Sequence, residues 1–418
     1  MRPYQLLQYV TSFTVVLAII LALGNAAWAG STYKVLYSFK GGSDGGGLYG
    51  GPTLDAKGDV YGVTSGGGAY GYGTAFELTP FAGGRWGKIL LHSFCAEQGC
   101  TDGALPQGSL ILDAAGDLYG TAGGGAGNSG VVFELKPELV SSAGWSFRVV
   151  YDTGSDGSLA MDKAGDLYGE WGPGKYRAGD IFELTHDSDG WEETVLYSFC
   201  SQQDCRDGEP PEWGVSWDAA GNLYGTTEFG GGNNAPECSI GCGVVYQVQP
   251  LGGGKWKYHM LHRFAAFSRD GLMPQAGVTL DGKGNVYGTT LYSGTSSGTV
   301  FKLTPQQDGS WKETILYNFP NAATNGGAPA GGVTFDNLGN LYGTASAGGD
   351  PTCDCGVVFK MTPQANGKWS YTVLHRFKGT DGYGPGYNLI FDPTYKHLYG
   401  TTVAGGSGGY GVVYEITP

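Results

Sequence analysis

Residues Gly277–Pro305 read GVTLDGKGNVYGTTLYSGTSSGTVFKLTP. This stretch predicts three short strands, GVTLD, NVYGTT and GTVFKLTP, because each is rich in β-branched or aromatic residues and is bounded by glycine-containing turns or a proline. A fourth strand, WKETILYNF at Trp311–Phe319, completes the unit, which then begins again. The chain is therefore organised around a repeated unit of four strands.

The Tyr-Gly pair of the second strand measures the repeat. It occurs seven times, at intervals of 49 to 63 residues. A period of this length with about four strands per repeat is typical of a β-propeller. The seven tyrosines are Tyr61, Tyr119, Tyr168, Tyr224, Tyr287, Tyr342 and Tyr399.

An aspartate ends the first strand before each Tyr-Gly. In six repeats a glycine three residues later supplies the positive φ that a tight hairpin needs, and Tyr395 replaces it in the seventh. The glycine of Tyr-Gly lies inside a strand, where it costs stability unless a ring or a backbone packs closely over it. We therefore expect tight packing near the propeller axis. The seven aspartates are Asp55, Asp113, Asp162, Asp218, Asp281, Asp336 and Asp392.

The two ends of the chain predict how the ring closes. Residues Tyr33–Phe39 (YKVLYSF) match a fourth strand, and the sequence stops after a third strand, Val412–Pro418. The N-terminal strand should therefore complete the last blade, which leaves no free edge. The predicted fold is an all-β, seven-bladed β-propeller with four-stranded blades, a single domain over residues 30–418.

The recurrent pattern GxLxxDxxGNLYGTTxxGG…GVVFxLTP is clearest at Gly214–Pro250 and Gly332–Pro363. It resembles the bacterial GloVer tandem-repeat family over the whole mature chain. The resemblance implies secretion and a propeller-like array, often with an interchangeable C-terminal anchor, and it carries no catalytic residues that can be transferred. In this sequence we expect no anchor segment after Pro418, which departs from that pattern.

The N-terminus predicts a secretory signal peptide over residues 1–29. Arg2 precedes an apolar run, Phe13–Leu23, and Ala27-Trp28-Ala29 offers a small-x-small cleavage pattern before Gly30. An uncleaved anchor is the alternative, although the apolar run is short for a membrane span. We expect an exported protein, extracellular or periplasmic, monomeric and without a membrane span in the mature chain.

The eight cysteines fall into four local pairs, which in an exported chain indicate disulfides that hold loops. A zinc site is the alternative interpretation. The last pair would close a very small ring, so its internal bonding stays open. The pairs are Cys95 with Cys100, Cys200 with Cys205, Cys238 with Cys242, and Cys353 with Cys355.

Charge restricts the partners. With a net charge of −14, nucleic acid and anionic membranes are poor partners, whereas cations or neutral polymers fit better.

The loop before the first strand carries an Asp-Gly-x-x-Pro motif in four repeats. Its aspartates form either a ring of carboxylates that binds Ca²⁺ or sugar hydroxyls, or a repeated Asx turn. They are Asp102, Asp207, Asp270 and Asp381.

The third repeat departs from the pattern. Glu170 replaces the usual threonine after Tyr-Gly, Trp171 follows it, and Tyr176 and Arg177 stand where other repeats are glycine-rich. These four residues predict either a specific pocket or sequence drift, since departure from a repeat is only a pointer to function.

Conventional catalytic sets are missing from the sequence. The histidines His92, His262 and His375 occupy a fourth-strand position that holds tyrosine in other repeats, which indicates packing. The leading hypothesis is a secreted, non-catalytic module that binds a glycan, a cation or a surface protein, with no resident cofactor. The alternatives are an extracellular polysaccharide hydrolase or lyase that uses carboxylates such as Glu170 or Asp207, and a purely structural envelope component.

Overall fold

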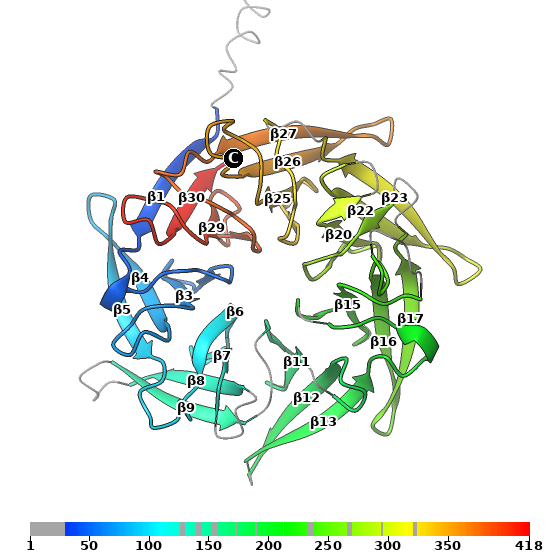
Figure 1. Ribbon diagram of the computed structural model, residues 1–418, viewed down its shortest axis with the longest axis horizontal. Coiled ribbons are helices and arrows are strands. Elements are labelled where there is room, and N and C mark those ends of the chain that lie inside the picture. The colour runs from blue at the N-terminus through cyan, green and yellow to red at the C-terminus, as the bar shows by residue number, and fades with distance from the viewer. Residues whose placement is uncertain are drawn as a thin grey trace, which may run out of the picture.

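Seven four-stranded sheets surround a central axis in the computed structural model (Figure 1). The structure describes residues 30–418 except 126–129, 139–143, 153–156, 172–173, 189, 212, 233–237, 266–269, 294–295 and 321–323. The predicted signal peptide at residues 1–29 lies outside the described residues. The predicted seven-bladed propeller with four-stranded blades is confirmed.

Each blade is an antiparallel sheet whose strands follow one another from the axis outward. Blades one to four consist of β2 (Thr53–Leu54), β3 (Val60–Thr64), β4 (Thr74–Phe81) and β5 (Arg85–Ser93); β6 (Ala104–Leu112), β7 (Leu118–Gly123), β8 (Val131–Pro137) and β9 (Trp145–Tyr151); β10 (Ala160–Met161), β11 (Leu167–Trp171), β12 (Asp180–Asp187) and β13 (Gly190–Ser198); and β14 (Ser216–Trp217), β15 (Leu223–Thr227), β16 (Val244–Gly252) and β17 (Lys255–Arg263). Blades five to seven consist of β19 (Thr279–Leu280), β20 (Val286–Thr290), β22 (Thr299–Pro305) and β23 (Trp311–Asn318); β24 (Thr334–Phe335), β25 (Leu341–Ala345), β26 (Val357–Pro363) and β27 (Trp369–Arg376); and β28 (Ile390–Phe391), β29 (Leu398–Thr402), β30 (Val412–Thr417) and β1 (Thr32–Ser38). Two short 3₁₀ turns, η1 (Gly42–Asp44) and η2 (Gln203–Cys205), and the small β18 (Gly271–Leu272) and β21 (Tyr292–Ser293) pair lie in the connections.

The N-terminal strand closes the last blade, as predicted. β1 pairs antiparallel with β30, and the register runs from Thr32 opposite Thr417 to Ser38 opposite Val412. Figure 1 shows β1 and β30 side by side next to the C-terminus. Nearer the axis, the hydroxyl of Thr401 donates to the carbonyl of Gly50 at 2.7 Å, so the last and first blades are also joined there.

The strand-ending aspartates hold the turns between the first and second strands. In blade five, Oδ1 of Asp281 accepts hydrogen bonds from the backbone N–H groups of Lys283 and Asn285 at 2.9 and 3.0 Å. Gly284 has φ of 77°, the left-handed conformation expected there. In blade seven, Tyr395 adopts the same conformation with φ of 56°. The sequence pattern thus encodes the turn directly.

Aromatic rings cover the glycines of the Tyr-Gly pairs. A Cβ atom added to Gly288 would lie 2.6 Å from Cζ of Phe301, on the neighbouring strand of the same blade. The six other blades repeat this contact, which confirms the predicted close packing. The covering residues are Phe76, Phe133, Phe182, Tyr246, Phe301, Phe359 and Tyr414.

Contacts between blades partly bury two of the outer tryptophans. Trp145 of blade two packs edge-to-face on Tyr61 of blade one, with ring centroids 5.8 Å apart, and Trp191 packs on Tyr119 in the same way at 6.0 Å. Such contacts join each blade to its neighbour through large apolar rings. These two tryptophans therefore have a packing role.

All four predicted cysteine pairs are disulfides, which corrects the zinc alternative, because an oxidised cysteine has no thiolate to offer a metal. Each bond joins residues two to five positions apart and so fixes a single loop. The last bond forms within its own pair, which the sequence left open. The bonds are Cys95–Cys100, Cys200–Cys205, Cys238–Cys242 and Cys353–Cys355.

Among the described residues, no helix has the length and apolar character needed to cross a membrane.

Candidate functional site

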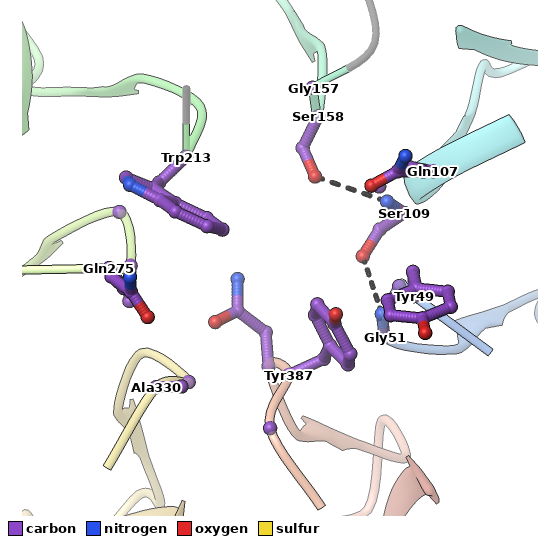
Figure 2. Close-up of a pocket in the computed structure, with 17 residues that line it drawn as sticks. Tyr49, Gly51, Gln107, Ser109, Gly157, Ser158, Trp213, Gln275, Ala330 and Tyr387 are labelled. Atoms are coloured by element: carbon purple, nitrogen blue, oxygen red, sulfur yellow. Dashed lines mark hydrogen bonds between the residues drawn. The ribbon is translucent and has the colours of Figure 1, made fainter. Parts of the chain in front are cut away.

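A cavity of about 170 Å³ lies on the propeller axis. All seven blades line it, six with residues that precede their innermost strands and blade two with residues inside β6 (Figure 2). The wall is thus assembled from loops that are far apart in the sequence and are brought together only when the ring closes.

Each blade contributes to the lining the residue that lies five positions before its strand-ending aspartate. Five residues before the aspartate the side chain is small in five blades: Gly50, Gly108, Gly157, Ala276 and Gly331. Small residues are needed because neighbouring loops touch. A Cβ on Gly50 would lie 2.0 Å from the carbonyl oxygen of Gly108, and one on Gly108 would lie 2.9 Å from the backbone of Gly157. The close backbone contact forms the continuous wall of the cavity.

Two blades place an aromatic residue in that register: Trp213 in blade four and Tyr387 in blade seven. Tyr49 lies one position earlier in blade one, and its ring packs edge-to-face on Tyr387 with centroids 6.2 Å apart. Figure 2 shows the indole of Trp213 extending toward the centre from one side, with Tyr387 and Tyr49 on the other. The cavity therefore has aromatic walls on two sides.

The polar groups of the cavity are amides, hydroxyls and backbone groups. Ser109 Oγ accepts a hydrogen bond from Gly51 N at 3.0 Å, and Ser158 Oγ accepts one from Ser109 N at 3.1 Å. Asn388 Oδ1 accepts from Gly332 N at 2.8 Å. These bonds link the loops of adjacent blades and fix the orientation of the lining side chains. Gln107 and Gln275 add two further amides.

The described lining of the cavity is uncharged, although the chain carries a net charge of −14. No described residue that lines it has a carboxylate, imidazole, ammonium or guanidinium group. Burial raises the pKa of the Tyr387 phenol, so this hydroxyl stays neutral around pH 7. A neutral site discriminates against charged ligands, because burying an unpaired charge is costly.

A ring of threonines supports the cavity wall from behind. The hydroxyls of Thr226, Thr289 and Thr401 each donate to a loop carbonyl of the next blade at 2.7 to 2.9 Å. In blade three Glu170 takes this position and accepts from the N–H of Gly214 at 2.7 Å and from the hydroxyl of Tyr246. Glu170 is 2% exposed and does not line the cavity. Its bond to Gly214 fixes the residue next to Trp213, so Glu170 holds in place the loop that carries the indole.

Two other candidates in blade three, Tyr176 and Arg177, do not line the axial cavity. Tyr176 is 44% exposed, and Lys175 Nζ lies over its ring at 5.1 Å from the centroid. Arg177 is also exposed and has φ of 62°. The side chain of Trp171 lies outside the described residues. Tyr176 and Arg177 are thus exposed whereas Glu170 is buried, and none of these three residues lines the axial cavity.

The four aspartates of the Asp-Gly-x-x-Pro loops lie at the junctions between outer strands. Each accepts a hydrogen bond from the backbone of its own loop: Asp102 from Ala96 N, Asp207 from Ser201 N, Asp270 from Ala265 N and Asp381 from Lys378 N, at 2.7 to 3.2 Å. Each also bonds the fourth-strand ring, which is His92, Tyr197, His262 or His375. None lines the axial cavity. The contacts match the turn interpretation, and they do not bring the four carboxylates together.

The disulfides hold connections away from the axis, and none of the eight cysteines lines the cavity. The carbonyl oxygen of Cys100 accepts hydrogen bonds from the N–H groups of Gly103 and Gly125, at 2.9 and 3.1 Å. That of Cys242 accepts from Met273 N at 2.9 Å, which ties blade four to the loop that enters blade five. The cysteines are therefore structural residues that brace loops, and they take no direct part in the candidate site.

Sequence reasoning passed over Trp213 and Tyr387, although the sequence held a signal for both. When the repeats are aligned on the strand-ending aspartate, the position five residues earlier is glycine or alanine in the other blades. A large ring in a small-residue register marks a departure from the repeat. The departures at Glu170 and Trp213 belong together, because Glu170 holds the loop that carries Trp213.

Comparisons with known proteins agree with the fold. The family model described as the Gloeobacter/Verrucomicrobia repeat matches residues 25–238 and 236–418. No curated protein matched the sequence.

Two solved structures show the same architecture. One is the extracellular domain of a protein described as a one-component system from B. thetaiotaomicron, with a TM-score of 0.54, 13% identity, and coverage of 92% of this chain and 41% of that chain. The other is puromycin hydrolase, with a TM-score of 0.50, 14% identity, and coverage of 90% and 52%. The chain thus spans about half or less of the length of these two structures. At such identities the likeness concerns the fold alone.

Proposed function

The chain belongs to the Gloeobacter/Verrucomicrobia repeat family, and from this premise we propose that it is an exported, non-catalytic binding module whose axial cavity holds a neutral sugar residue of a glycan. The observation that carries the proposal is the lining of the cavity. It combines three aromatic rings with amide and hydroxyl groups, and its described residues carry no charged side chain.

This lining matches the chemistry of a sugar. One face of a sugar ring presents C–H groups that pack on an aromatic side chain, and its hydroxyls exchange hydrogen bonds with amides and backbone groups. Trp213 and Tyr387 offer the aromatic faces, and Gln107, Gln275 and Asn388 offer the amides. Ligand pockets with few polar groups in fixed positions gain specificity from that placement.

The size of the cavity limits the ligand. About 170 Å³ is below the roughly 300–1,000 Å³ of pockets that enclose drug-sized molecules. The cavity therefore suits one sugar unit, and the remainder of an oligosaccharide would extend outside. A terminal residue of a glycan chain meets this requirement.

Binding is favoured over polysaccharide cleavage by the same lining. Glycosidases place two carboxyl groups on either side of the scissile bond, about 5 to 9.5 Å apart. The described lining of the cavity provides no such pair. Glu170 and Asp207, the acids suggested by the sequence, are 2% and 0% exposed and bond within the protein.

Export is part of the proposal. The predicted signal peptide supports it, and so do the four disulfides, since such bonds persist mainly in oxidising compartments. A fusion of residues 1–29 to a periplasmic reporter tests this directly. Retention of the reporter in the cytoplasm would count against export and leave the cavity proposal untouched.

Titration calorimetry with a panel of neutral, acidic and basic saccharides tests the cavity. We expect neutral sugars to bind, Trp213→Ala to weaken the affinity at least tenfold, and Trp213→Phe to retain part of it. Tyr176→Ala is the matched control, because Tyr176 is an exposed aromatic residue outside the cavity. Equal losses in Trp213→Ala and Tyr176→Ala, a preference for acidic sugars, or no binding across the panel would overturn the proposal.

A further inference from the structure

The junctions between neighbouring outer strands repeat one arrangement of side chains. A ring near the end of one outer strand faces the residue at a fixed position of the next outer strand. At four junctions both partners are rings that stack, with centroids 3.7 to 4.5 Å apart: His92–Phe147, Tyr197–Tyr258, Tyr317–Tyr371 and His375–Tyr33. Stacked rings of this kind bury apolar surface at the junction between two blades.

The junction between blades four and five lacks the second ring. Glu313 of β23 takes its place, opposite His262 of β17 and beside Asp270 of the loop. At the junction between blades seven and one, the corresponding position holds Lys88, which pairs with Asp44 at 3.0 Å. A carboxylate thus stands where another blade uses an ammonium group to neutralise the loop aspartate.

The three side chains bring their donor atoms together. Nε2 of His262 lies 3.2 and 3.3 Å from the two carboxylate oxygens of Asp270 and 3.6 Å from Oε1 of Glu313. One ligand atom from each of the three residues lies within 4.8 Å of the others. Donor atoms of a tetrahedral site with metal–ligand bonds of about 2.0–2.1 Å are about 3.3–3.4 Å apart. The separations of Nε2 of His262 from Asp270 and from Glu313 bracket that value.

The cluster has an excess of negative charge in a poorly hydrated place. The side chains of His262, Asp270 and Glu313 are only 19, 11 and 18% exposed. Oε1 of Glu313 is fully buried and lies 3.6 Å from Nε2 of His262. A buried carboxylate pair of this kind requires a proton or a cation between its oxygens.

We propose that His262, Asp270 and Glu313 form a divalent-metal site that joins blades four and five and takes an ion of the Zn²⁺ or Mn²⁺ class. One imidazole nitrogen with two carboxylate oxygens is a donor set typical of these ions. Ca²⁺ and Mg²⁺ fit less well, because they take oxygen ligands almost alone. The metal supplies the positive charge that Lys88 supplies at its own junction.

Calorimetry and thermal unfolding of the chelator-treated full chain test the site, with Zn²⁺, Mn²⁺, Ca²⁺ and Mg²⁺ as separate probes. We expect one equivalent of Zn²⁺ or Mn²⁺ to bind and to raise Tm, because an ion that binds only the folded state stabilises it by mass action. His262→Ala and Glu313→Gln should each weaken the affinity at least tenfold. His375→Ala is the matched control, since it removes a histidine that pairs with Asp381 at 3.0 Å but faces Tyr33.

A second variant keeps the test decisive if removal of a ligand unfolds the protein. Glu313→Tyr rebuilds the ring stack of Tyr317 and Tyr371 at this junction. We expect it to match or exceed the metal-free wild type in Tm and to show no response to Zn²⁺ or Mn²⁺. No metal binding by the wild type, or a response that persists in Glu313→Tyr, would overturn the proposal. A Tm that responds to pH but to none of the ions would assign a proton to the cluster and equally refute the metal site.

Discussion

Replacement of Gly288 by alanine tests whether the covered glycines set the spacing inside the blades. The new Cβ would lie 2.6 and 2.9 Å from two ring carbons of Phe301. That ring is 0% exposed and packs against Phe264 with centroids 5.3 Å apart, so it has no room to move aside. Overpacking of a core costs about 1–3 kcal/mol, and alanine recovers about 0.5–1 kcal/mol because glycine is unfavourable in a strand. We expect a net loss of about 1–2 kcal/mol in the free energy of unfolding.

Denaturant unfolding followed by tryptophan fluorescence measures this loss. Gly282→Ala is the control in the same blade, because an added Cβ there meets nothing within 4 Å; it should change stability by less than about 0.5 kcal/mol. Phe301→Leu removes the ring carbons that clash, so Gly288→Ala should cost at least about 1 kcal/mol less in that background. Equal effects of Gly288→Ala and Gly282→Ala, or an unchanged cost beside Phe301→Leu, would refute the explanation.

Three further outcomes are expected. Burial alone would raise the pKa of the turn aspartates, but hydrogen bonds from asparagine, backbone and tyrosine outweigh it and lower the pKa of Asp218, Asp281 and Asp336. The stability that these carboxylates contribute is therefore complete above the unfolded pKa of about 3.9 and is lost as pH falls through the lower folded pKa values. As pH is lowered from 7, Tm should stay constant to about pH 5 and then fall. A constant Tm down to about pH 2 would contradict this. Glu170→Ala leaves the Gly214 N–H and the Tyr246 hydroxyl unpaired in the core and should cost about 2–4 kcal/mol and weaken sugar binding, whereas Glu170→Gln should cost less; calorimetry and denaturation compare the two. The double change of Cys95→Ser and Cys100→Ser releases a loop of sequence separation 5 and should lower the free energy of unfolding by about 2 kcal/mol, while an unaltered midpoint would show that the loop is held by its hydrogen bonds alone.

The fold was predictable because each blade is encoded locally. The strand-ending aspartate accepts hydrogen bonds from the residues two and four positions later. The turn is therefore determined by a few consecutive residues, such as those from Asp281 to Asn285. The repeat then multiplies a weak local signal seven times. Closure by Tyr33–Phe39 followed from counting strands, because an unpaired third strand at one end matched an unpaired fourth strand at the other.

The candidate site was less predictable because no blade contains it. The seven loops each supply one to three residues, and most of these are glycine, serine or alanine with no chemistry of their own. The acids Asp207 and Glu170 stood out in the sequence as candidate site residues. In the structure both are buried and accept hydrogen bonds within the fold. The sequence signal for the cavity was an aromatic residue, Trp213 or Tyr387, at a position that is glycine or alanine in the other blades. The meaning of that signal depends on a geometry that one sequence does not show.

The pairing of β1 with β30 gives the molecule a seam. Residues Thr32 and Thr417 are neighbours in the sheet although almost the whole chain separates them. This strand pairing therefore has a very large sequence separation, and it cannot form during synthesis until β30 has been made. Until β1 pairs with it, the edge of β30, VVYEIT, is an open template for any strand of suitable register. The same hydrogen bonds can be made by the N-terminal strand of a second copy, which would interlock two rings by exchange of one strand. Pairing with the strand of the same chain is favoured because the covalent link gives that strand a high effective concentration near β30. A high protein concentration during refolding reduces this advantage.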